Sequence, residues 1–181
     1  MYDACKNSSQ PDASAAGAFK AWTASGFPAS KLVLGLPAYG YVSKSSATSL
    51  RTRSSFLKKH SKETSGNAVR VVNSDGGSEG QVLFRELVQQ DVLIRDFDQQ
   101  IGKVNFITSG GFERTWDQCS STPYLRSTLV DQIVTYDDPD SVGLKTKFAR
   151  VVGMLGVNFF DLHGDTDEWD LVNAAADALL A

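Results

Sequence analysis

Two mostly apolar runs constrain the fold of this chain more than any other feature. The first, LVLGLPAYGYV, covers residues 32–42, and the second, Val157–Phe160, lies within GMLGVNFFDLHGDTDEWD. Neither run alternates apolar with polar residues, a pattern typical of strands that are buried on both faces in a parallel sheet. The sequence therefore predicts a continuous buried strand over 32–42 and another over 156–162.

Helix signals flank both strands. A helix is expected over 12–25, before Gly26, and another begins at the N-cap Asp138 with Pro139 in its first turn. The apolar stripe of this second helix consists of Leu144, Phe148, Val151 and Leu155. Helix, strand, inserted segment, helix, strand and a final helix make the tail of an alternating α/β protein.

The segment between the strands, residues 43–138, has a mixed α+β pattern. Its expected elements are a long loop over 43–66, a strand over 68–72, a turn over 74–80, a helix over 82–93, a strand over 105–107, and antiparallel strands in TWDQCSSTPYLRS and QIVTYDD with aromatic residues on one face. Two buried parallel strands cannot close a barrel, which takes about 250 residues. The chain is therefore expected to be a piece of something larger.

Composition excludes several partners. The formal charge is -3, and the basic residues between Arg51 and Lys62 lie in a Ser-rich stretch, so we interpret them as a solvated face and predict no nucleic-acid binding. No run approaches the ~18 apolar residues of a membrane span, and the N-terminus lacks the regions of a signal peptide. We predict no membrane association and no cofactor.

Two cysteines, Cys5 and Cys119, stand too far apart in the sequence for a metal site that uses C-x-x-C pairs. One disulfide between them is a possible alternative, and such a bond persists in an oxidising compartment. Asn7-Ser8-Ser9 is an N-glycosylation acceptor pattern, which points the same way.

The polar run after the second strand has two interpretations. Its members are Asp161, His163, Asp165 and Asp167. A metal site needs three or four ligands facing one ion, and strand alternation places only Asp161 and His163 on one face. We favour a structural role without metal: Asp165 or Thr166 caps the last helix, Asp167 and Glu168 lie in its first turn, and hydrogen bonds hold His163.

Several motifs occur in the order in which glycoside hydrolase family 18, the chitinases, carries them. They are SGFPASKLVLGLPAYGY, TPYLRS, VTYDDPDSVGLKTKFA and MLGVNFFDLHGD. From about residue 12 onward the chain resembles the C-terminal part of this family, especially its fungal secreted members. The resemblance implies the last two strands and helices of a (β/α)₈ TIM barrel. Its parts are a barrel helix and strand seven (1–42), an α+β insertion domain (43–138), and a barrel helix, strand eight and the final helix (139–181).

The family's chemistry depends on residues that this chain lacks. The N-acetyl oxygen of the sugar attacks its own anomeric carbon while a Glu protonates the leaving oxygen. In the family these groups lie in an Asp-x-x-Asp-x-Asp-x-Glu run, which is absent here; Asp96-Phe97-Asp98 lacks the Glu and is interpreted as surface. The resemblance thus implies a fragment of an extracellular chitinase that walls the groove for chitin or chito-oligosaccharide. It has no catalytic residue, it is inactive alone, and the N-terminal part of the barrel is its missing partner.

The resemblance also implies substrate-binding residues. Tyr39 ends strand seven and faces the groove, Tyr41 stands where many members have Arg, and Phe160 stands where a Trp usually forms the floor under the reacting sugar. The remaining residues implied are Arg114, Trp116 and Asp117, near the leaving-side sugars, and a pairing of Cys5 with Cys119. Plain packing of Tyr39 and of Trp116 remains an alternative.

Two other functions fit the sequence. A chitinase-like carbohydrate-binding protein that lost catalysis is consistent with the changes at Phe160 and Tyr41. A binding module built on residues 43–138 alone would fold without its neighbours. For the isolated chain we expect aggregation or partial folding, because the apolar strands lack partners.

Overall fold

The computed structural model describes residues 1–6, 8, 12–45, 68–100 and 102–181. Its helices are α1 (Ala15–Ala24), α2 (Phe84–Gln89), α3 (Pro139–Val151) and α4 (Asp170–Leu180), with 3₁₀ turns η1 (Ala29–Lys31) and η2 (Leu162–Gly164). Its strands are β1 (Val33–Pro37), β2 (Tyr39–Lys44), β3 (Gly80–Leu83), β4 (Leu93–Asp98), β5 (Lys103–Thr108), β6 (Glu113–Asp117), β7 (Thr122–Ser127), β8 (Gln132–Thr135) and β9 (Gly156–Phe160).

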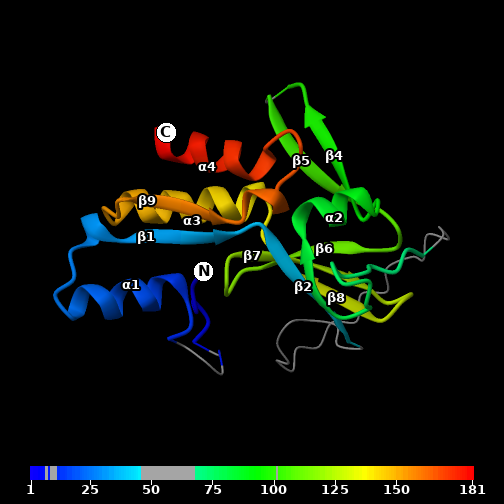
Figure 1. Ribbon diagram of the computed structural model, residues 1–181, viewed down its shortest axis with the longest axis horizontal. Coiled ribbons are helices and arrows are strands. Elements are labelled where there is room, and N and C mark those ends of the chain that lie inside the picture. The colour runs from blue at the N-terminus through cyan, green and yellow to red at the C-terminus, as the bar shows by residue number, and fades with distance from the viewer. Residues whose placement is uncertain (7, 9–11, 46–67, 101) are drawn as a thin grey trace.

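The molecule has two parts (Figure 1). One part contains α1, the parallel pair β1–β9, α3 and α4, and the other contains the five-stranded sheet β3-β2-β8-β7-β6, α2 and the β4–β5 hairpin. A single buried apolar cluster runs through both parts, from Leu36 and Leu171 to Val82 and Leu125. In the described residues no helix has both the length and the apolar character needed to cross a membrane.

The predicted parallel pairing of the two apolar runs is confirmed, but the first run is not one strand. β1 pairs with β9 from Val33↔Gly156 to Pro37↔Phe160, and the chain then passes into β2, which pairs with β3 and β8. Ala38 marks the change: its N–H donates to the Phe160 carbonyl (3.1 Å), and its carbonyl accepts from the Phe84 N–H (3.0 Å). The backbone groups of this one residue are therefore satisfied in both parts.

The parallel pair is buried on one face, not on both as predicted. Leu34, Val157 and Phe159 pack against the apolar cluster, and Leu36 belongs to it. On the opposite face Val33 is 46% exposed, which leaves this side of the sheet open. The apolar run therefore includes residues, such as Val33, that the structure leaves exposed.

The helices largely follow their predicted positions. The start of α3 is confirmed, because the Asp138 carboxylate accepts from the Ser141 N–H and the Ser141 hydroxyl accepts from the Asp138 N–H, both at 3.0 Å. Helix α1 starts later than predicted, since Ser14 is its N-cap. The expected stripe on α3 is wrong as a buried face: Leu144, Val151 and Leu155 are exposed, and the buried positions are Ser141, Val142, Thr146 and Ala149.

The last helix begins at Asp170, four residues after the predicted cap. Asp165 nevertheless acts as its cap from the preceding loop, accepting from the Leu171 and Val172 N–H groups at 3.0 Å each. Thr166 donates its hydroxyl to the Asp170 carboxylate (2.7 Å). Asp167 and Glu168 therefore precede α4 instead of lying in its first turn.

The middle of the chain departs further from prediction. The expected strand over 68–72 is absent because the side chain of Gln132 bonds both backbone groups of Val71 at 2.9 Å, replacing a neighbouring strand. The expected helix over 82–93 shortens to α2, and β4 pairs with β5 in a hairpin that the sequence did not reveal. The antiparallel β6–β7–β8 strands are confirmed, but Trp116 pairs with Pro123 and Tyr124 with Thr115, so their rings lie on opposite faces.

Candidate functional site

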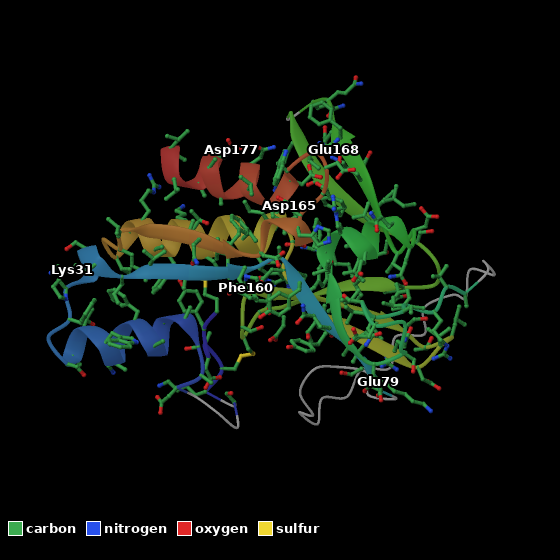
Figure 2. The ribbon with its side chains drawn as sticks, viewed as in Figure 1. Lys31, Glu79, Phe160, Asp165, Glu168 and Asp177 are labelled. Atoms are coloured by element: carbon green, nitrogen blue, oxygen red, sulfur yellow. A yellow bond between two sulfur atoms is a disulfide. The ribbon has the colours of Figure 1, made fainter. Side chains whose placement is uncertain are left out.

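Three aromatic side chains meet where the two parts join. Tyr39 and Tyr41 come from β2, and Phe160 is the last residue of β9. The ring centroid of Tyr39 lies 5.9 Å from that of Tyr41 and 6.5 Å from that of Phe160, with edge-to-face geometry in both pairs. Phe160 lies near the middle of the molecule, at the boundary between the parts (Figure 2). We call these residues the aromatic trio.

Two glycines allow the chain segments around the trio to approach each other. A Cβ at Gly40 would lie 2.2 Å from the Thr135 carbonyl oxygen, and a Cβ at Gly164 would lie 2.2 Å from the Ala38 carbonyl oxygen. Both are backbone contacts, which cannot move aside as a flexible side chain can. Because both residues are glycines, β2 can pack closely against β8, and η2 can pack closely against the junction of β1 and β2.

The trio is an exposed aromatic surface. Phe160 is 68% and Tyr41 is 52% exposed, and Tyr39 is half-buried. Clustered exposed rings commonly mark a binding surface, because their burial on a ligand removes apolar area from water. Tyr hydroxyls add hydrogen-bonding groups at the edge of the surface. The arrangement can bind a flat, partly apolar ligand that also carries hydroxyl or amide groups.

Arg114 lies in an ion pair and not with the trio. Its Nε and one terminal nitrogen donate to the same Asp138 carboxylate oxygen (2.9 and 2.6 Å), and it also contacts Asp140 at 3.2 Å. Burial raises the pKa of the Asp138 carboxyl, against the opposing effects of the Ser141 N–H and the Arg114 guanidinium. The guanidinium also stacks over Trp116, 5.5 Å from the ring centroid. The ion-pair partners of Arg114 are therefore the two carboxylates at the start of α3.

Trp116 faces a different space from the trio. Together with Arg114 it lines a cavity of about 910 Å³ between β6, α3 and α4, to which Lys147 and Asp177 also contribute. Of the described residues that line this cavity, none belongs to the trio. The structure therefore separates Arg114 and Trp116, two of the six predicted substrate-binding residues, from the trio.

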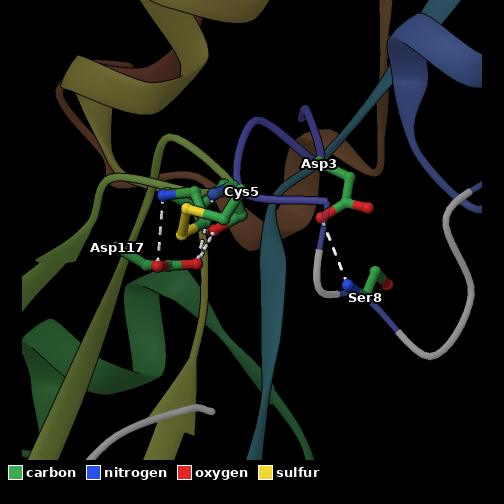
Figure 3. Close-up of a disulfide and its surroundings, with 7 residues drawn as sticks. Asp3, Cys5, Ser8 and Asp117 are labelled. Atoms are coloured by element: carbon green, nitrogen blue, oxygen red, sulfur yellow. Dashed lines mark hydrogen bonds between the residues drawn. A yellow bond between two sulfur atoms is a disulfide. The ribbon is translucent and has the colours of Figure 1, made fainter. Parts of the chain in front are cut away.

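Asp117 holds a turn. Its carboxylate accepts from the Cys119 and Ser120 N–H groups at 3.2 Å each, as the dashed lines in Figure 3 show, and so closes the β6–β7 connection. Cys119 in this turn forms a disulfide with Cys5, with the two Cα atoms 5.1 Å apart. The Ala4 N–H donates to the Cys119 carbonyl (3.0 Å), so the first residues of the chain are fixed to this turn.

The polar run after β9 is not gathered around one point. His163 is exposed, and its side chain makes no hydrogen bond among the residues that the structure describes, so the prediction that hydrogen bonds hold it is wrong. In the same described ranges no group of three or more potential metal ligands is present. Asn7, the predicted glycosylation position, lies outside the described residues.

The sequence did not point to three further cations that lie between the two parts. Arg85, Arg95 and Lys103 pair with carboxylates that are 37 to 82 residues away along the chain. A local motif cannot reveal pairs at such separations. Only the distances between charged side chains in the folded structure identify these ion pairs.

Two curated relatives resemble the chain over most of its length. A chitinase-like effector from Moniliophthora roreri is 27% identical over 178 residues, covering 91% of this chain and 41% of that protein. Chitinase A1 from Niallia circulans is 30% identical over 143 residues, covering 79% of this chain and 17% of that protein. The chain thus spans less than half the length of these relatives.

Solved structures and a family model agree with this similarity. A chitinase from Rhizomucor miehei has a TM-score of 0.67 and 28% identity, covering 98% of this chain and 47% of that one. Human YKL-39, described as a pseudo-chitinase with retained chitooligosaccharide binding, shares the fold at a TM-score of 0.62 and 20% identity, over 92% of this chain and 40% of that one. The model of glycosyl hydrolases family 18 matches residues 1–165. The resemblance seen in the motifs is therefore confirmed, and the chain belongs to glycosyl hydrolases family 18.

Proposed function

We propose that this chain is part of an extracellular chitinase and forms one wall of its groove for chitin or chito-oligosaccharides. The observation that carries the proposal is the position of the aromatic trio: Phe160 ends β9, and Tyr39 and Tyr41 follow the C-terminal end of its parallel partner β1. In barrels of this class, ligands are bound at that end of the strands. Pyranose rings with acetamido groups match the apolar and hydrogen-bonding character of the trio.

Hydrolysis would be substrate-assisted, with retention, and its acid would come from outside this chain. The sequence has no Asp-x-x-Asp-x-Asp-x-Glu run, so we propose no catalytic residue among its 181 and no activity for the chain alone. The open face of β1–β9, on which Val33 is exposed, supports a position as strands seven and eight of a larger barrel. The N-terminal part of that barrel would be the partner that covers this face.

The proposed division of the chain follows the two parts of the molecule. Residues 1–42 and 139–181 would supply barrel elements, and residues 43–138 would supply the α+β insertion domain. The five-stranded sheet supports one adjustment: β2 pairs with β3 and β8, so the insertion would begin near Tyr39. The Cys5–Cys119 disulfide supports an extracellular location, because such bonds persist in oxidising compartments.

A non-catalytic chitinase-like binding protein is the second candidate. Phe160 at the floor position and Tyr41 in place of Arg favour it, since each change removes a hydrogen-bond donor that family members usually have. The similarity to a chitinase-like effector is consistent with this candidate. Genomic sequence upstream of Met1 separates the two: an intact acidic run supports the enzyme, and a run that lacks the Glu supports the binding protein.

Titration with an N-acetylglucosamine tetramer tests the binding proposal. We expect saturable heat of binding by calorimetry, and about tenfold weaker affinity in Tyr39→Ala and Phe160→Ala, because losing one stacked ring costs about 1.4 kcal/mol. Phe97→Ala is the control, since Phe97 is an exposed ring on β4 that does not belong to the trio. Unchanged affinity in both trio variants, or equal losses in the control, would contradict the proposal.

A further inference from the structure

We propose that a set of ion pairs between the two parts positions Tyr39 and Tyr41 relative to Phe160, and so sets the affinity of the trio for its ligand. This inference rests on the proposed function. The set, which we call the charge seam, consists of the cations Arg85, Arg95, Lys103 and Arg114 and the carboxylates Asp138, Asp140, Asp167 and Asp170. It lies outside the trio; its member Arg114 was also predicted from the resemblance to lie near the leaving-side sugars, and a measurement without ligand, given below, separates that role from positioning.

The seam is polarised. Every one of its cations comes from the part with the five-stranded sheet: Arg85 from α2, Arg95 from β4, Lys103 from β5 and Arg114 from β6. Its carboxylates all come from the starts of α3 and α4 or from the loop just before α4. Negative charge is favourable at helix N-termini. The two parts thus meet as a positive face against a negative one.

The buried members fix direction as well as distance. The Arg95 Nε–H donates to both oxygens of the Asp170 carboxylate at 3.0 Å each, and that carboxylate is 2% exposed. Arg114 donates twice to Asp138, which is likewise buried. Charge-assisted bonds from a planar guanidinium hold a defined orientation. Lys103 and Asp140, 2.6 Å apart, complete the seam at the solvent edge.

The chain crosses between the parts at two points, and the Cys5–Cys119 disulfide adds a third covalent link through the segment before α1. Ala38 alone separates β1 from β2, and residues 136–138 separate β8 from α3. The apolar cluster that continues across the junction holds the parts together, but hydrophobic attraction is non-directional. The guanidinium–carboxylate bonds of the seam add a defined direction to these links and so set the angle between the parts.

The trio spans this junction, which links the seam to binding. Tyr39 and Tyr41 move with the five-stranded sheet, whereas Phe160 moves with the parallel pair. A small rotation at the seam changes the 6.5 Å separation of Tyr39 and Phe160 while leaving each part folded. Binding of an uncharged sugar chain is therefore expected to depend on charges that do not contact it.

The decisive variant removes both seam ion pairs of Arg114, with Asp138 and with Asp140, without leaving a buried charge. Arg114→Met with Asp138→Asn deletes both charges, and Asn remains a good N-cap for α3. We expect the affinity for the N-acetylglucosamine tetramer to fall about three- to tenfold, the usual range for coupling through a packed network, at a temperature where circular dichroism shows the protein folded. Arg114→Lys is expected to fall between this variant and the parent.

A second buried ion pair provides the matched control. Lys145 and Asp137 are 2.5 Å apart, and both belong to α3 or the residues just before it, so this pair does not cross the junction. Lys145→Met with Asp137→Asn should cost similar stability and leave tetramer affinity unchanged. Equal loss in the two double variants would mean a general effect of stability and would overturn the positioning role.

A measurement without ligand separates failure of this inference from failure of the proposed function. Proton–proton Overhauser contacts between the rings of Tyr39 and Phe160 should weaken or disappear in Arg114→Met/Asp138→Asn and persist in the control. If the parent binds no tetramer, the proposed function fails, and the ring contacts still decide the seam. Unchanged ring contacts in a folded seam variant would refute positioning.

Discussion

The five-stranded sheet and the parallel pair differ in how completely they are covered. On the sheet, Val42, Val82 and Val134 are fully buried within the apolar cluster. On the pair, one face is packed and the other leaves Val33 exposed. The comparison teaches that the apolar cluster shared by both parts covers these sheet strands more completely than the pair, which owes its order to one packed face, to helix caps and to its junction with the sheet.

The same truncation in the two regions should have the largest difference in effect. Val134→Ala removes two buried methyl groups and leaves a cavity, for an expected loss of about 2–3 kcal/mol in the free energy of unfolding. Val33→Ala should cost about 0.5 kcal/mol or less, because the side chain is already exposed. Urea unfolding of the two variants measures both values. Comparable losses would mean that the open face is covered in solution.

The next largest effect is expected from loss of a helix cap, which tests the polar interactions that stabilise the part with the parallel pair. Asp165→Ala removes the acceptor for the Leu171 and Val172 N–H groups, with an expected cost of about 1–2 kcal/mol. Asp167→Ala, two residues later, changes an 86% exposed carboxylate and should cost about 0.5 kcal/mol or less. Thermal unfolding of both variants provides the measurement. If Asp167→Ala is the more harmful, the cap assignment is wrong.

The smallest effect at neutral pH is expected at Tyr136, between the two regions. Its hydroxyl is buried with no hydrogen-bond partner among the described residues, and burial, with Asp138 nearby, raises the pKa of Tyr136 above its usual value. The folded state then keeps its proton where the unfolded chain, with a pKa of about 10, loses it. This contribution is fully present below pH ~10 and is lost as the pH rises further.

Tyr136→Phe removes the titrating group. Unfolding free energies at pH 7 should agree within about 1 kcal/mol, because the deleted hydroxyl satisfies no partner. Above pH ~10 the variant should lose less stability than the parent with each step in pH. Parallel pH curves for the two proteins would show that Tyr136 does not titrate differently on folding.

Local signals in the sequence predicted the features that depend on near neighbours. Asp138 followed by Pro139 specified the start of α3, because capping acts within one helical turn. The split of 32–42 was missed, because the pairing of β2 with β3 and β8 is decided by residues 38 or more positions away. The strand over 68–72 was over-predicted for the same reason, since Gln132 supplies the hydrogen bonds of a strand.

The candidate site was predictable only in part. The resemblance singled out Tyr39, Tyr41 and Phe160, which the fold brings together. It also singled out Arg114 and Asp117, but their bonds lie with Asp138 and with the turn at Ser120. A motif records that a residue type recurs at a position; it does not distinguish a contact with ligand from a contact that builds the scaffold.

The Cys5–Cys119 disulfide joins two residues that are 114 positions apart in the sequence and so closes the chain between them into a covalent loop. Most of the sheet, the β4–β5 hairpin, α1 and two members of the trio lie inside that loop. A protease that cuts one peptide bond anywhere between the two cysteines would therefore release no fragment. The nicked protein would still migrate as one species on a non-reducing gel and would separate into two only after a thiol was added.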